Sequence, residues 1–252
     1  MYIYMSDNFK NVLNEIKNLR KSLNFFSPSN NKEFQISPLS LKQQKSIIEN
    51  GFSSSLSILF FNVTFFNIIK ENFIGDIKDL NTLDRVNISL SLRQKISNEY
   101  KDEDDNVYNI SDVIEKNKEE IVIAPKEVVT ENFTFKLKSP NLEIDNKINK
   151  ILLKKYKNKK LDDGVINLLI SDLYVYEMLK FIEEINFGET TINIQDDLDN
   201  SLKFINEINT YELKDILKYI NEVRDLELNL SKIPKTDSDT NINITADFFI
   251  VQ

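Results

Sequence analysis

Residues 133–140 read FTFKLKSP, and this stretch decides the fold class of the chain. Apolar side chains at positions 133, 135 and 137 alternate with polar ones at 134, 136 and 138, which predicts a β-strand with one buried face. Pro140 ends the strand, because proline has no backbone N–H to donate to a neighbouring strand. The alternation therefore predicts a sheet near the middle of a chain whose other patterns are mostly helical.

A small β module is expected around this strand, from Val107 to Pro140. Val107–Ile110 and Ile121–Ile123 are short apolar stretches that suit further strands. The predicted fold class is α+β, mainly helical with a small antiparallel β module in the middle. The expected parts are an N-terminal helical part over residues 1–100, the β-rich module over 101–140, and a C-terminal helical part with a terminal strand over 141–252.

Apolar residues spaced three to four positions apart predict helices on both sides of the β module. Ser40 suits the N-cap of one helix, and Asn50-Gly51 suits its C-terminal end. Leu56–Ile69 is the most apolar stretch, but a membrane-spanning helix needs roughly 20 apolar residues, so we expect a buried helix there. The expected helices cover residues 6–19, 41–51, 53–73, 82–96, 142–156, 165–187, 197–208 and 211–223, and short strands are expected at 33–36 and 191–194.

The composition excludes several classes of active site. The chain has 252 residues and contains neither cysteine nor histidine, which excludes disulfides, sites ligated by these residues and a Ser-His-Asp triad. The spacing of its four glycines forms neither a dinucleotide-binding fingerprint nor a P-loop. We therefore expect a protein that is not an enzyme and that uses no cofactor and no metal.

The charge and the N-terminal residues bear on partners and location. A formal net charge of −8 gives no overall attraction to the phosphates of nucleic acid. Residues 1–7 lack the basic-then-apolar pattern of a secretory signal. We expect a protein of a reducing cytoplasm that binds other proteins and no membrane, and association into a homo-oligomer is compatible with this expectation.

Two groups of acidic residues suggest sites, and each has a simpler interpretation. Residues 102–106 offer carboxylates for calcium, but positions 107 and 113, where an EF-hand needs glycine and glutamate, hold valine. The adjacent pairs Asp162-Asp163, Glu183-Glu184 and Asp196-Asp197 have the residue type of a glycosidase site, but adjacent residues on a helix do not face each other. We expect a solvated loop in the first case and charged helix ends in the second.

Lysine is concentrated between residues 154 and 160, where Tyr156 lies among Lys154, Lys155, Lys157, Lys159 and Lys160. Cations beside an aromatic ring suit single-stranded nucleic acid. Cations are also favoured at the C-terminal end of a helix, which is the simpler interpretation, and a contact with an acidic protein is compatible as well. Lys154, Lys155 and Lys157 are therefore candidate partner-binding residues.

The C-terminal segment is the second candidate for partner binding. Ile242 and Ile244 alternate with polar residues and predict a strand, and Phe248 and Phe249 follow it. Exposed adjacent phenylalanines would be costly, so we expect the four side chains to be buried in this chain or in a neighbour. Burial within the chain is the default, because recruiting a partner costs more entropy.

Three segments resemble the baseplate hub subunit family of T-even-like contractile-tailed phages. They are SPLSLKQQK at 37–45, similar to that family's P-L-T-x-x-x-x-K start of a helix; LNTLDR at 80–85 with LSLR at 90–93, similar to its central L-x-x-x-D … L-R segment; and INITADFF at 242–249, similar to its alternating end with paired phenylalanines. The chain departs from the family at residues 229–240, which lack the Cys-x-x-Cys pair that many relatives carry before the terminal phenylalanines.

The resemblance implies no catalytic residue and no cofactor. It implies a structural or assembly subunit of a contractile phage tail baseplate, in the hub region, that docks to other baseplate or tail proteins. The corresponding location is the host bacterial cytoplasm during assembly, or the virion tail baseplate for a retained subunit. The alternative of a different class is a nucleic-acid-binding accessory protein that uses the Lys154–Lys160 cluster, and an enzyme is the third and least favoured class.

Overall fold

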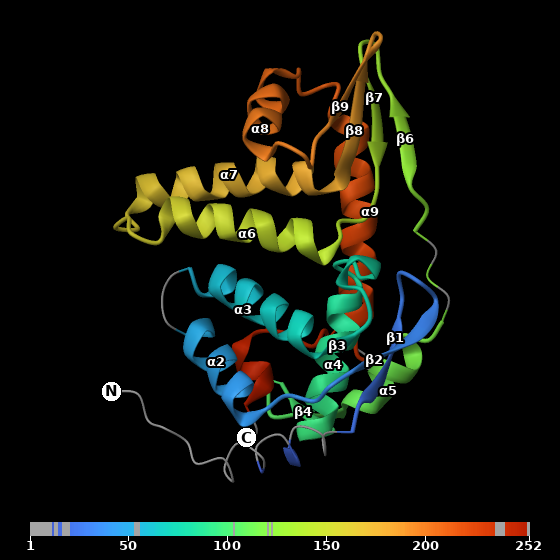
Figure 1. Cartoon of the computed structure of the whole chain (residues 1–252), viewed down its shortest axis with the longest axis vertical. Helices are drawn as coiled ribbons and strands as arrows, with labels where there is room; N and C mark the ends of the chain where they lie inside the picture. The colour runs from blue at the N-terminus through green and yellow to red at the C-terminus, as the bar shows by residue number, and fades with distance from the viewer. Residues whose placement is uncertain are drawn as a thin grey trace.

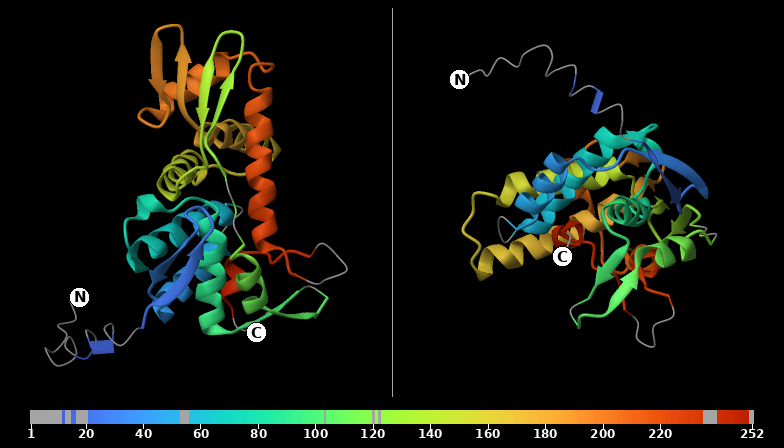
Figure 2. Two further views of the ribbon diagram at one scale, coloured as in Figure 1. Left: turned by 90° about the vertical axis from the view of Figure 1, so that its right-hand side faces the viewer. Right: turned by 90° about the horizontal axis from the view of Figure 1, so that it is seen from below.

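The computed structural model describes residues 12, 15–16, 21–52, 56–102, 104–119, 121, 123–234 and 240–250. The fold is α+β and mainly helical, with small antiparallel sheets, as the sequence predicts. Two lobes lie one above the other, and helix α9 (Lys214–Ser231) runs along both of them (Figures 1 and 2). Residues 12, 15 and 16 are helical, and the rest of the helix expected over 6–19 lies outside the described residues.

The first lobe is built from the N-terminal half of the chain together with its last described residues. Strands β1, β2 and β3 form one antiparallel sheet, and β4 pairs with β5 in a hairpin. The elements are β1 (Leu23–Ser27), β2 (Lys32–Ile36), α2 (Leu41–Gly51), α3 (Ser57–Asn72), β3 (Phe73–Ile74), η1 (Ile77–Asp79), α4 (Asp84–Ile96), β4 (Glu99–Lys101), β5 (Val107–Asn109), α5 (Ile110–Lys116) and η2 (Ala246–Phe249).

Helix α2 has the predicted bounds, but Gly51 does not have the predicted role as a left-handed cap. The Ser40 side chain accepts a hydrogen bond from the backbone N–H of Gln43, and the Gln43 side chain accepts one from the N–H of Ser40, which completes a capping box. Gly51 is the last residue of the helix. A Cβ atom at Gly51 would lie 2.0 Å from the Cβ of Ala246. The glycine therefore permits a close approach of the C-terminal segment rather than a left-handed cap.

The second lobe combines a four-stranded sheet with a helical hairpin. The sheet has the order β6-β7-β8-β9, and helices α6 and α7 project sideways from α9 (Figure 1). The elements are β6 (Lys126–Val129), β7 (Thr134–Leu137), α6 (Leu142–Tyr156), α7 (Asp163–Phe181), β8 (Ile182–Phe187), β9 (Thr190–Asn193) and α8 (Leu198–Glu207).

Strand β8 occupies residues 182–187, where the apolar pattern predicts the end of a long helix over 165–187. Ion pairs join Lys136 to Glu184 and Lys138 to Glu183, between the β7 region and β8. Opposite charges on neighbouring strands favour pairing, and this partner is distant in sequence. The helix prediction is therefore wrong at its C-terminal end, because it used local periodicity alone.

The β structure expected over 101–140 is divided between the two lobes. Strand β5 pairs only with β4 in the first lobe, whereas β6 and β7 belong to the sheet of the second lobe. Strand β7 is internal to that sheet and pairs with a strand on each edge. One of these strands, β8, lies beyond residue 140 and therefore outside the predicted module. Residues 121 and 123, expected in a strand, lie in an irregular connection.

A buried charged network joins the two lobes where α4, α6 and α7 meet. The Asp145 carboxylate on α6 binds Arg85 of α4 at 2.6 Å and Lys180 of α7 at 2.7 Å. Burial alone would raise the pKa of Asp145, but the charges of Arg85 and Lys180 outweigh it and hold the pKa at about 2. Asp145 and Lys180 are only 5% and 8% exposed, so a substrate does not reach them, and the network acts in the fold.

Candidate docking surface

The C-terminal candidate residues are buried in the first lobe. Ile242, Phe248 and Phe249 are 3%, 4% and 0% exposed, and Ile244 is half-buried. The main-chain oxygen of Phe249 also accepts a hydrogen bond from Nε2 of Gln44 on α2 at 2.6 Å. Burial within the chain is the expected default, and these residues stabilise the chain's own fold instead of forming an exposed docking tail.

The terminal strand predicted for this segment is wrong. Asn241 forms an isolated β-bridge with Lys232, but residues 242–244 are irregular and residues 246–249 form the 3-10 helix η2. Residues three apart lie on the same side of a 3-10 helix. Ala246 can therefore meet Gly51 of α2 while the ring of Phe249 packs against the aromatic rings of α3. A strand would not present both residues to these neighbours.

The lysine cluster lies at the tip of the α6–α7 hairpin. Lys154 and Lys157 are exposed, whereas the Lys155 ammonium pairs with the Asp172 carboxylate of α7. The Tyr156 side chain is 1% exposed, and its hydroxyl donates a hydrogen bond to Asp172 at 2.7 Å. Burial and this hydrogen bond raise the pKa of Tyr156. Because the ring is covered, it is not available to stack on a nucleic-acid base.

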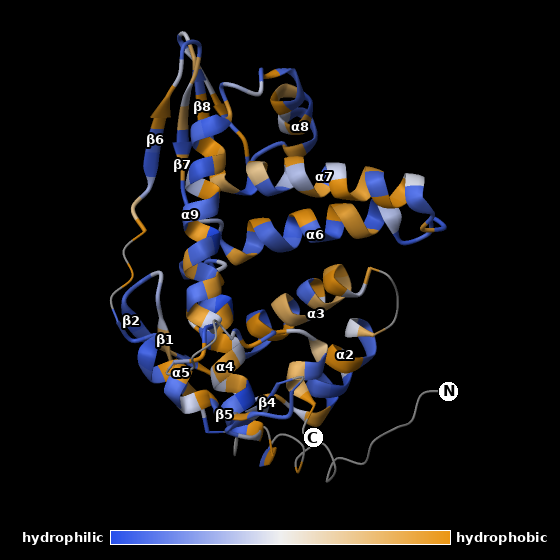
Figure 3. Ribbon diagram, turned by 180° about the vertical axis from the view of Figure 1, so that it is seen from behind, coloured by the Kyte–Doolittle hydropathy of each residue, from blue (hydrophilic) through white to orange (hydrophobic). Residues whose placement is uncertain are grey.

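Helix α7 carries the feature that sequence reasoning missed. Apolar residues occur along the whole helix (Figure 3), a composition typical of a helix that is buried on all sides. Its inner end is indeed buried, but Ile166, Leu168, Ile170 and Tyr174 are 39%, 57%, 58% and 55% exposed. The outer half of α7 extends beyond α8, which packs on this helix (Figure 1).

Three of these residues form a continuous stripe. Ile166, Ile170 and Tyr174 are spaced four residues apart, so they lie on one face of the helix, whereas Leu168 lies on another. We call these three side chains the α7 apolar surface. The lysine-rich tip directly precedes them in sequence. The α7 apolar surface and the lysine cluster therefore lie on one projecting element, which is an arrangement that suits recognition of another macromolecule.

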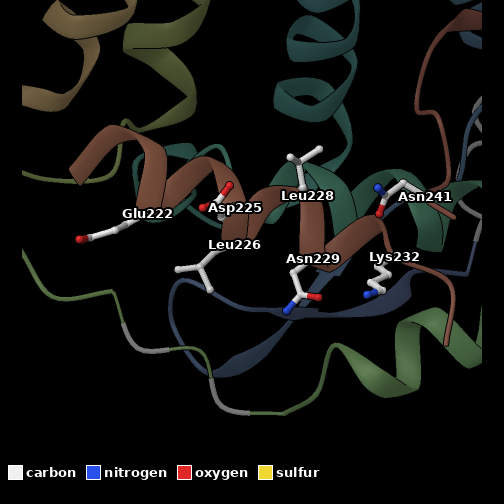
Figure 4. Close-up of a pocket in the computed structure, with 7 residues that line it drawn as sticks. All are labelled: Glu222, Asp225, Leu226, Leu228, Asn229, Lys232 and Asn241. Carbon is white, nitrogen blue, oxygen red and sulfur yellow. The ribbon is translucent and has the colours of Figure 1, made fainter. Parts of the chain in front are cut away.

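A groove beside α9 does not have the properties of a catalytic site. It has a volume of about 580 Å³, and its lining residues are Glu222, Asp225, Leu226, Leu228, Asn229, Lys232 and Asn241. The side chains point in different directions and do not converge on one point (Figure 4). Catalysis by paired groups needs such convergence, and these side chains do not show it.

The acidic residues singled out from the sequence have local structural roles. The Asp102 carboxylate accepts hydrogen bonds from Asn106 and from the hydroxyl of Tyr108 within its own hairpin. Asp162 caps α7 and Asp197 caps α8. Within the described ranges, no group of three or more metal-ligating side chains is close enough to hold an ion.

Comparisons with known protein families, with curated proteins and with solved structures found no match to this chain. Across the part of the chain that the structure describes, no helix is long and apolar enough to span a membrane. The α6–α7 hairpin and the three short segments at 37–45, 80–93 and 242–249 are therefore the features that bear on function.

Proposed function

We propose that this chain is a structural or assembly subunit that binds another protein through the α6–α7 hairpin and catalyses no reaction. The observation that carries this proposal is the α7 apolar surface. Two of its three large apolar side chains are more than half exposed and the third is 39% exposed, on a helix that is buried at its inner end. A partner that covers them would remove apolar area from water, which favours association.

We further propose that the partner is a protein of the hub region of a contractile phage tail baseplate. This setting rests on the resemblance of the three segments at 37–45, 80–93 and 242–249. These segments contribute to α2, α4 and η2, which pack together in the first lobe. The Arg93 guanidinium lies 5.9 Å from the ring centroid of Phe248, one link between two of them. The three segments are therefore parts of a single packed unit.

The experiment compares tagged full-length chains isolated from the cell in which the protein is made. Ile170→Asp with Tyr174→Asp places charges in the apolar surface, whereas Leu41→Asp changes an exposed apolar residue on α2, where Leu41 is 83% exposed. The proposal predicts that tail proteins co-purify with the wild type and with the Leu41 variant, and are lost with the double variant.

Two results would overturn the proposal. Equal recovery of the same tail proteins with all three chains would exclude the α7 surface as the docking site. Salt-sensitive binding of a single-stranded oligonucleotide, abolished when Lys154, Lys155 and Lys157 are changed to alanine, would instead support the nucleic-acid-binding alternative. Circular dichroism of each variant verifies that the hairpin is folded before either result is interpreted.

A further inference from the structure

Lysines on α6 form a stripe that is longer than the cluster at its end. Residues 146–161 contain seven lysines and no aspartate or glutamate, in a chain whose net charge is −8. Lys147, Lys150, Lys154 and Lys157 follow one another at intervals of three, four and three residues, which places them on one face of the helix. All four are exposed. We call them the α6 lysine stripe.

Other lysines of the hairpin form ion pairs within the chain, but most lysines of the α6 lysine stripe do not. Lys155 pairs with Asp172, and Lys180 pairs with Asp145. Lys147 donates to the main-chain oxygen of Gln195 at 3.2 Å. Among the residues that the structure describes, Lys150, Lys154 and Lys157 form no ion pair. Their charges therefore contribute little to the stability of this chain and are free to interact with a partner.

Building on the proposed function, we infer that the partner presents an acidic protein surface to the hairpin. Its carboxylates face the α6 lysine stripe, and its apolar side chains cover the α7 apolar surface. Complementary charge steers the encounter and fixes the register, while apolar burial supplies affinity. This division of roles matches the two helices of the hairpin, one carrying cations and the other apolar groups.

Nucleic acid and anionic lipid fit the same hairpin less well. The phosphate backbone of nucleic acid has no apolar counterpart for Ile170 and Tyr174, and the ring of Tyr156 is covered. Exposed carboxylates at Asp162 and Asp163 lie between the lysines and the α7 apolar surface in sequence. They would be repelled by the uniform negative charge of either surface. A protein surface can place its charges selectively and avoid this repulsion.

The test uses synthetic amphipathic helices of about 20 residues with leucine on one face, flanked by glutamate, glutamine or lysine. The probes are added to the full chain, to Lys150→Glu with Lys154→Glu, and to Lys214→Glu with Lys218→Glu as a matched control on α9. We expect the Leu/Glu probe to bind the wild type and the control. We expect about tenfold weaker binding to the stripe variant and at higher salt.

Each outcome bears on one of the two proposals. Equal binding of the Leu/Glu and Leu/Gln probes, sensitive to Ile170→Asp, would overturn the acidic partner but support docking through α7. No binding of any helix would count against the proposed function as well. Binding of a dT20 oligonucleotide or of phosphatidylserine vesicles, lost in the stripe variant and not matched by the Leu/Glu probe, would overturn the inference in favour of that surface.

Discussion

The C-terminal segment and helix α7 are both rich in apolar side chains, but α7 leaves several of them exposed. Phe249 is fully buried against α2 and α3, whereas Ile170 is 58% exposed on the projecting helix α7. The same residue class therefore serves the fold in one region and remains available in the other. The comparison teaches that position in the fold, and not apolarity, identifies the docking surface.

Truncation after Thr240 should produce the largest loss of stability. It removes the buried side chains of Ile242, Phe248 and Phe249, and each buried phenylalanine contributes about 1.5–3 kcal/mol. The free energy of unfolding, measured by urea denaturation, should fall by about 4–9 kcal/mol. A chain truncated after Ile250 serves as the control. An unchanged urea midpoint after truncation at Thr240 would mean that the segment does not support the fold.

Asp145→Ala should have the second largest effect, at the base of the same hairpin. The substitution leaves the partly buried Arg85 without its carboxylate and leaves Lys180 paired with Glu177 alone, and breaking a buried pair from one side costs about 3–5 kcal/mol. Lys155→Ala breaks the exposed pair at the tip and should cost about 1 kcal/mol or less. Equal losses of stability in urea for the two variants would contradict the claim that the buried network at the base stabilises the hairpin more than the exposed ion pair at the tip.

The free energy of unfolding of the wild type should fall at acidic pH because Asp145 becomes protonated. Its pKa is about 2 in the fold against a reference value of 3.8. A depressed carboxyl pKa contributes stability above the unfolded value and loses it as the pH falls through the folded value. This contribution, about 2 kcal/mol, should disappear between pH 4 and pH 2. Asp145→Asn should lack it, and parallel pH profiles of the two chains would refute this account.

Ile170→Asp with Tyr174→Asp should have the smallest effect on stability. Both side chains are more than half exposed, and surface substitutions usually change the free energy of unfolding by about 0.5 kcal/mol or less. Thermal unfolding should therefore give nearly the wild-type midpoint. A loss comparable to that of Asp145→Ala would show that the α7 apolar surface is buried by the chain itself in solution.

The sequence predicts elements whose signals are local. Helix α6 has the predicted bounds, Leu142–Tyr156, because Asn141 caps it and its apolar residues keep a helical spacing. Strand β7 follows the alternation at 133–138 closely. Burial of Phe248 and Phe249 is also predictable, because adjacent exposed phenylalanines would be costly.

Other features depend on partners that are distant in sequence. Strand β8 is fixed by pairing with β7, and η2 is fixed by the space beside Gly51. The exposure of Ile170 and Tyr174 depends on how far α8 reaches along α7, which local periodicity does not encode. The α6 lysine stripe, in contrast, can be predicted from the sequence. The spacing of Lys147, Lys150 and Lys154, three and four residues apart, places them on one face of a helix.

Hydrogen–deuterium exchange tests the central claim most directly, by comparing the isolated chain with the chain in its co-purified complex. A docking surface on the hairpin predicts slower exchange over residues 150–175 in the complex, with little change over residues 240–250. Slower exchange confined to residues 240–250, with α7 unchanged, would contradict it and assign partner binding to the C-terminal segment.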